Sequence, residues 1–154
     1  MPYGNEPRPP DAPVPPQELI GAALFLGLAA VLSISFHGAY LIAFALGRVG
    51  FDPLTLSVLT LNAVGFVGTL WLLALRRWAW RLAVAYAGLE VILRLYYVFN
   101  NLVIRPGGNL DWLGAIGEVA LALVFLVVLA YLLGEDTRER LDAREAYRRA
   151  QASP

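Results

Sequence analysis

Four long runs of apolar residues, each broken by few polar positions, dominate the pattern along the chain. They cover residues 18–46, 53–75, 77–104 and 110–133. A helix needs about 20 residues to cross the roughly 30 Å hydrocarbon core of a bilayer, and every run is long enough. Because short links join successive runs, the pattern predicts an all-α integral membrane protein, a four-helix up-down transmembrane bundle.

The segments outside these runs have a different character. Residues 1–17 are rich in proline and show no apolar period, which predicts a disordered tail. Asp52 followed by Pro53 predicts a capped start for the second span, and Asn109 is a similar cap for the fourth. Residues 135–154 alternate in charge sign and predict a charged helix or tail. Since acids and bases balance there, a solvated extension of the fourth span is favoured over a segment that binds anionic lipid.

Composition strengthens the membrane interpretation and removes several classes of function. The chain is 58% hydrophobic with a mean hydropathy of +0.60, which is more apolar than an ordinary soluble domain. The absence of cysteine excludes disulfides, thiolate metal sites and thiol redox chemistry. A net charge of zero without a basic face argues against nucleic acid. The expected partners are the lipid bilayer and a homo-oligomer or another membrane protein, and no cofactor is expected.

The positions of the arginines predict the orientation. All twelve basic residues are arginine. Nine lie in the first tail, the link between spans two and three, and the last segment: Arg8, Arg76, Arg77, Arg81, Arg138, Arg140, Arg144, Arg148 and Arg149. The other two links hold only Arg48 and Arg105. Because positive residues favour the inner side, both termini are expected in the cytoplasm, with the protein in the cell (inner) membrane.

The third span carries two charges in its middle, Glu90 and Arg94. They are one helical turn apart with the acid first, which suits an ion pair on one helix. At about 100° per residue, both fall with Tyr86, Tyr97 and Asn101 in a stripe roughly 80° wide. A polar stripe on an apolar span must face protein or water rather than lipid, so it defines the inner face of this helix.

The other three spans each place a polar residue where it could meet this stripe. With the expected orientation and about 1.5 Å of rise per residue, His37, Asn62, Arg94 and Glu118 lie about 12–15 Å below the outer end of their spans, and Glu90 about 21 Å. The candidate intramembrane polar cluster therefore comprises His37, Asn62, Glu90, Arg94, Tyr97 and Glu118.

Two interpretations of this cluster stay open. It could be a buried hydrogen-bonded network that specifies helix pairing. It could instead be an outward-facing pocket that binds an ion or a small polar ligand, or that passes protons. One arginine against two acids leaves one carboxylate without a counter-charge, and that acid would be protonated or would share a proton with His37. Intramembrane ionisable groups mark functional sites by default, because stability alone is a poor reason to bury them.

No catalytic motif is found, and the single histidine favours a hydrogen-bonded role over a metal site. Ser33 lies four positions before His37, but no acid is placed to orient such a pair. The sequence thus favours a non-catalytic membrane protein that acts by binding or association within the bilayer. The alternative is an oligomeric small-solute or proton-coupled transporter that uses the polar cluster, and an enzyme is the weakest of the three hypotheses.

Overall fold

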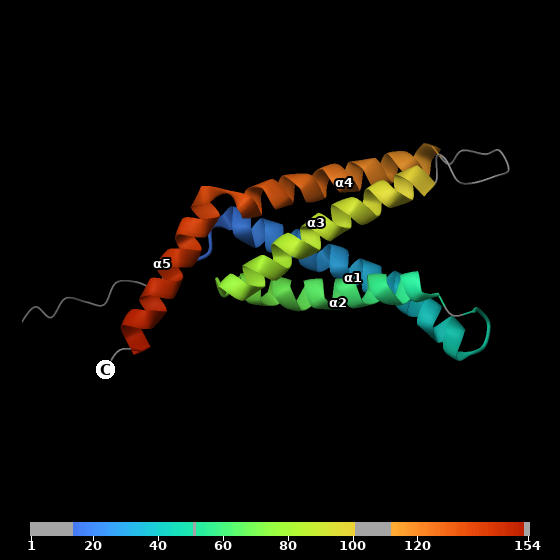
Figure 1. The fold of residues 1–154 in the computed structure, drawn as a ribbon, viewed down its shortest axis with the longest axis horizontal. Helices are drawn as coiled ribbons and strands as arrows, with labels where there is room; N and C mark the ends of the chain where they lie inside the picture. The colour runs from blue at the N-terminus through green and yellow to red at the C-terminus, as the bar shows by residue number, and fades with distance from the viewer. Residues whose placement is uncertain (1–13, 51, 101–111, 153–154) are drawn as a thin grey trace, which may run out of the picture.

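A computed structural model describes residues 14–50, 52–100 and 112–152, and this part of the chain forms five helices (Figure 1). They are α1 (Gln17–Ala45), α2 (Pro53–Leu72), α3 (Arg77–Phe99), α4 (Trp112–Leu133) and α5 (Glu135–Ala152). No strand occurs in these ranges, so the all-α prediction is confirmed. The predictions for the first thirteen residues, Asn101 and Asn109 concern positions outside the described ranges.

Helices α1 to α4 are long and apolar enough to cross a membrane, and each falls within or overlaps one of the four predicted spans. Residues 101–104 of the third predicted span and residues 110–111 of the fourth lie outside the described ranges. Much of their outward surface consists of large apolar side chains. Leu24, Ile92 and Val127 are 64%, 64% and 69% exposed, respectively. Water solvates such continuous apolar surface poorly, whereas lipid hydrocarbon would cover it, so the surface fits a membrane location.

The start of α2 follows directly from local chemistry. The carboxylate of Asp52 accepts hydrogen bonds from the backbone N–H groups of Leu54 at 3.0 Å and Thr55 at 3.2 Å, and Pro53 occupies the first turn. The predicted cap is therefore confirmed. The helix ends at Leu72 rather than at the predicted Leu75. Leu75 has a φ of 51°, which no residue inside a right-handed helix adopts, and this turn redirects the chain into α3.

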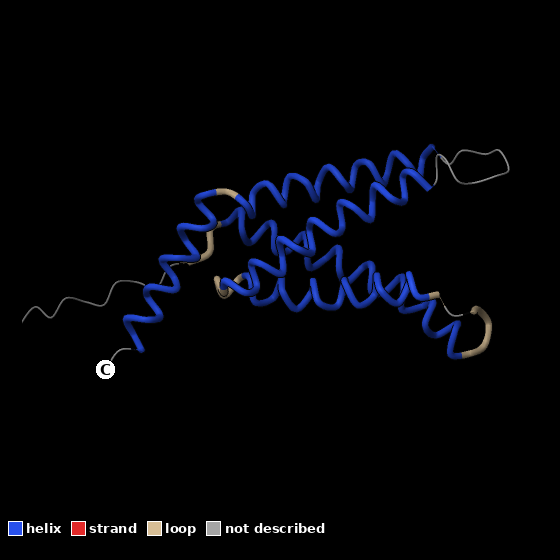
Figure 2. The backbone as a smooth tube through the Cα atoms, in the orientation of Figure 1, coloured by secondary structure: helices blue, strands red, loops and turns tan. Residues whose placement is uncertain are grey.

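Helices adjacent in sequence pack against one another: α1 on α2, α2 on α3 and α3 on α4. Helices α1 and α4 also meet through Phe25 and Phe125, whose ring centroids are 5.1 Å apart. Away from α5, the pair α3–α4 diverges from the pair α1–α2, as the backbone trace shows (Figure 2). This divergence separates the part of α1 that carries Ser33 and His37 from the parts of α3 and α4 that carry Arg94 and Glu118. The candidate site lies between them.

Helices α2 and α3 approach closely because glycines face large side chains. A Cβ atom on Gly65 would lie 2.6 Å from the ring of Tyr86, and one on Gly68 would lie 3.1 Å from the Cβ of Leu82. Ala83 and Ala87 of α3 are fully buried in the same core. Small residues permit this kind of contact, in which dispersion between closely packed backbones holds helices together in lipid.

Helix α5 is a separate element and not the predicted extension of the fourth span. The chain leaves helical geometry at Gly134 and re-enters it at Glu135 (Figure 1). The hydroxyl of Thr137 donates to the carbonyl of Tyr131 at 3.1 Å, and Leu141 is buried in the core. Thr137 and Leu141 thus attach one face of this charged helix to the rest of the protein. The balanced charge pattern of the segment does not reveal this attachment.

Arginines tie α5 to the turn between α2 and α3. Arg77 forms an ion pair with Asp142 and lies 3.6 Å from Glu145. Arg148 donates hydrogen bonds to the carbonyl oxygens of Ala74 and, at 3.3 Å, Leu75. Both carbonyls belong to the turn that follows α2, so Arg148 supplies hydrogen-bond partners for backbone groups of this turn.

Candidate functional site

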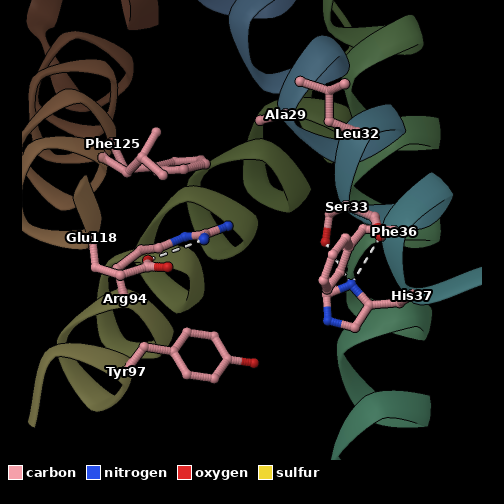
Figure 3. Close-up of a pocket in the computed structure, with 10 residues that line it drawn as sticks. Ala29, Leu32, Ser33, Phe36, His37, Arg94, Tyr97, Glu118 and Phe125 are labelled. Atoms are coloured by element: carbon pink, nitrogen blue, oxygen red, sulfur yellow. Dashed lines mark hydrogen bonds and ion pairs between the residues drawn. The ribbon is translucent and has the colours of Figure 1, made fainter. Parts of the chain in front are cut away.

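Arg94 lies between two carboxylates from two helices. Its Nε and Nη2 atoms donate to Oε2 of Glu90, one turn earlier on α3, at 3.2 and 3.0 Å. Its Nη1 atom donates to Oε2 of Glu118 on α4 at 3.1 Å (Figure 3). One guanidinium therefore binds an acid on its own helix and an acid on the neighbouring helix. The N–H donors of a guanidinium form a rigid fork that can bond two carboxylates at once. The ammonium of a lysine is a point charge without this fixed geometry.

The two acids differ in their surroundings. The side chain of Glu90 is 0% exposed, and its Oε1 atom has no hydrogen-bond partner among the described residues. The side chain of Glu118 is 23% exposed. With both acids ionised, the three groups carry one negative charge in excess. A buried group of ions is stable only when its charges are compensated, so the excess calls for a proton or another cation.

His37 is held by its own helix in a defined orientation. Its Nδ1 atom lies 2.8 Å from the carbonyl oxygen of Ser33 and 3.3 Å from the hydroxyl of the same residue. Because a carbonyl oxygen only accepts, Nδ1 is the donor in the short contact, and Nε2 of the neutral ring keeps its lone pair. This second ring nitrogen points toward the space between α1 and α3 (Figure 3). The site thus offers one uncharged acceptor opposite an ionic group.

A cavity of about 470 Å³ separates α1 from α3 and α4 (Figure 3). Polar side chains line it from both sides: Ser33 and His37 on α1, and Arg94, Tyr97 and Glu118 on α3 and α4. Its apolar wall is formed by Ala29, Leu32, Phe36, Leu121 and Phe125. Volumes between about 300 and 1,000 Å³ with a few converging polar groups are typical of small-molecule sites.

Four residues of the sequence-derived cluster line this one cavity: His37, Arg94, Tyr97 and Glu118. Glu90 lies behind Arg94 and contacts the cavity through that residue alone in the described contacts. Asn62 takes part in a different contact. Its side-chain N–H donates to the carbonyl of Val58 at 2.8 Å, and its Oδ1 accepts from the hydroxyl of Tyr86 at 2.8 Å.

The aromatic wall of the cavity was missed at the level of sequence, although a signal for it exists. Phe125 follows Glu118 by seven positions, so both lie on one face of α4, and Leu121 lies between them on that face. Phe125 is held edge-on by Phe25 at 5.1 Å and by Tyr86 at 6.3 Å between ring centroids. Apolar residues three and seven positions after a polar residue lie on its face of a helix, and this spacing is the signal that predicts the wall.

Metal binding has no support from the described residues, because they contain no group of three or more His, Asp or Glu side chains that could hold an ion. Comparison of the chain with protein-family models, curated proteins and solved structures finds no significant match. The described part of the chain is thus an all-α protein with four helices able to cross a membrane, and its distinctive chemistry lies in this cavity.

Proposed function

We propose that the protein spans the cell (inner) membrane four times, with both termini in the cytoplasm. The excess of arginine in the α2–α3 link and in α5 supports this orientation. In this orientation the cavity faces the outer half of the bilayer. A reporter enzyme active only in the cytoplasm, fused after Pro154, is expected to be active, and a fusion after Arg48 inactive. The opposite pattern would reverse the orientation.

We further propose that the protein is non-catalytic and acts by binding a small polar molecule within the membrane. The observation that carries this function is the sharing of Arg94 by Glu90 and Glu118 at the wall of a 470 Å³ cavity. A charged side chain at the centre of a span costs at least about 2.5–3.5 kcal/mol on insertion scales. Interhelical polar contacts return only about 0.6 kcal/mol on average. Helix association alone is therefore a weak reason for three ionic groups beside an open space.

Two features of the site disfavour catalysis. The Nδ1 atom of His37 donates to a carbonyl, so it cannot also accept the proton of the neighbouring Ser33 hydroxyl. In the described contacts no acid orients the imidazole, as a serine nucleophile would require. Binding of a ligand, in contrast, needs neither this proton transfer nor an orienting acid.

Native mass spectrometry of the protein released gently from its own membrane tests the binding function. The expected spectrum shows a bound small molecule on the wild-type chain and its loss from Glu118→Gln. Ser35→Ala is the matched control, because Ser35 is exposed and bonds only the Val31 carbonyl of its own helix in the described contacts. If no preparation carries a small molecule and a partner protein is released instead, the cavity is not a binding site, and the chain acts by association.

A second candidate function is proton-coupled transport of a small solute by an oligomer. His37 and Glu118 line the same cavity and can both exchange protons, which favours it. In liposomes loaded with a pH-sensitive dye, wild-type protein would then move protons, while Glu118→Gln would not. Proton flux identical in empty and protein-containing liposomes would exclude transport and leave binding unaffected.

A further inference from the structure

We propose that the ligand of the cavity is a small organic cation: a protonated amine, carrying at least one N–H donor, attached to an apolar body. This inference rests on the proposed binding function and specifies its ligand class. It follows from four independent features of the site, namely its charge, its uncharged acceptor, its aromatic rings and its volume.

The first feature is the excess of negative charge. Glu90 and Glu118 face a single arginine, so the ionised site lacks one positive charge. Of the two acids, only Glu118 lines the cavity, and it is also the more exposed. An anionic ligand would need Arg94, but three of the five N–H donors of this residue already bond the two acids, so an anion would have to compete with two carboxylates for its charge. A cation completes the charge balance, whereas an anion would increase the imbalance.

The second feature lies on the opposite wall. His37 presents the lone pair of Nε2 to the cavity, because its Nδ1–H is held by the Ser33 carbonyl. A primary, secondary or tertiary ammonium carries at least one N–H donor, with which it can bond the carboxylate of Glu118 or this nitrogen. A quaternary ammonium has none and would leave the imidazole unsatisfied.

Aromatic rings form the third feature. Phe36, Tyr97 and Phe125 all border the cavity, and the faces of aromatic rings attract cations electrostatically. Packing fixes Phe125, which is buried and lies edge-on to Tyr86 with ring centroids 6.3 Å apart, whereas Phe36 is exposed and lies edge-on to His37 at 5.5 Å. The charged group of an amine would thus meet both carboxylate and ring, a combination that selects cations over neutral molecules.

Volume is the fourth feature, and it excludes a bare ion as the whole ligand. A water molecule occupies about 30 Å³, so a cavity of 470 Å³ is many times larger than a bare ion or ammonium. Ala29, Leu32 and Leu121 supply an apolar wall that a bare ion would leave uncovered. An aliphatic or aromatic body attached to the amine would fill this part of the site.

Three probes of similar shape carry different charges, so they separate the effect of charge from that of shape. They are benzylammonium, which is positive, benzyl alcohol, which is neutral, and benzoate, which is negative. Binding to the full chain in phosphatidylcholine nanodiscs is measured by saturation-transfer NMR, with empty nanodiscs as the partition control. Benzylammonium is expected to bind saturably and at least tenfold more tightly than either other probe. Glu118→Gln should weaken it tenfold or more, and Ser35→Ala should leave it unchanged.

A second variant keeps the test valid if Glu118→Gln does not fold. Leu121→Trp adds bulk to the apolar wall without changing any charge, and it should also abolish benzylammonium binding. Equal or tighter binding of benzyl alcohol or benzoate would overturn the cation assignment while the binding function stands. Absence of saturable benzylammonium binding would also overturn it. The binding function itself fails only if native mass spectrometry finds no small molecule on the chain.

Discussion

The guanidinium of Arg94 lies 3.1 Å from the carboxylate of Glu118, and this ion pair joins α3 to α4 at the wall of the cavity. The same guanidinium binds Glu90 at 3.0 Å. Loss of either acid therefore leaves Arg94 with one counter-charge, and loss of both leaves it with none. The network is redundant with respect to each single acid.

This redundancy predicts that Glu90→Gln and Glu118→Gln are each mild and that the double variant is not. Each single substitution leaves one ion pair and should cost on the order of 1 kcal/mol. The double variant strands a partly buried arginine, which should cost about 3–5 kcal/mol. The measurement is the fraction of protein that stays monodisperse in detergent after heating to a series of temperatures. The midpoint temperatures of the two single variants and the double variant are then compared with that of the wild type.

The matched control is the triple variant Glu90→Gln, Arg94→Met, Glu118→Gln. With the stranded charge removed, it should recover most of the stability that the double variant loses, because an apolar replacement of buried ions is often tolerated. Strictly additive single and double variants would show that the two acids do not share Arg94 in the folded protein.

Tyr86→Phe should destabilise the protein although it removes only one oxygen. The hydroxyl of Tyr86 donates to Oδ1 of Asn62, and both side chains are buried. Without this donor the amide oxygen has no described partner, and an unsatisfied buried acceptor costs about 1–3 kcal/mol. Thermal unfolding followed by tryptophan fluorescence measures the loss. The pair Tyr86→Phe, Asn62→Leu removes both polar groups and should be more stable than Tyr86→Phe alone; equal stability would contradict the buried bond.

Local features of this fold could be predicted from sequence, because the groups involved are near neighbours along the chain. The four apolar runs give the spans, Asp52 caps the helix that begins at the next residue, and Glu90 meets Arg94 at one turn's separation. The helix ends were less predictable. The turn at Leu75 depends on a positive φ in a leucine, a residue with no preference for it.

Contacts between distant segments could not be derived in this way. The pairing of Arg94 with Glu118 spans 24 positions and depends on how α3 and α4 rotate against each other. Asn62 meets the polar stripe of α3 at Tyr86, and not at the cavity that Arg94 and Glu118 line. The acceptors of Arg148 are backbone carbonyls, which every residue has, so no side-chain pattern marks its docking site.

Gly65→Ala should disrupt the contact between α2 and α3. The added Cβ would lie 2.6 Å from the Tyr86 ring, which is too close for any pair of carbon atoms, so the helices must separate or the ring must move. A cost of about 1–3 kcal/mol is expected for such overpacking. Gly88→Ala is the control, since a Cβ there meets nothing within 4 Å. Thermal unfolding of the two variants should separate them, and equal midpoints would mean that α2 and α3 do not pack at Gly65.

The cap of α2 should give the protein a stability component that depends on acidic pH. The hydroxyl of Thr55, 2.6 Å away, and the backbone N–H groups of Leu54 and Thr55 lower the pKa of Asp52 below its usual 3.8. Because the folded pKa is the lower one, this stabilisation is complete above the unfolded value and disappears as pH falls through the folded value. Exchange of the amides in the first turn of α2 should therefore accelerate below about pH 4. Asp52→Asn should remove that acceleration; persistence in this variant would assign it to another group.

Docking of α5 should depend on Arg148 rather than on the overall charge of the helix. Arg148 donates to the carbonyls of Ala74 and Leu75, and hydrogen bonds that involve a charged group contribute about 1.5–3 kcal/mol. Arg148→Met should therefore release α5 from the turn and accelerate its amide exchange about tenfold or more, measured by mass spectrometry in nanodiscs. Arg140→Met removes the same charge at an exposed position of the same helix and should change exchange little. If both variants accelerate exchange equally, net charge holds α5 in place, and the bonds to the carbonyls do not.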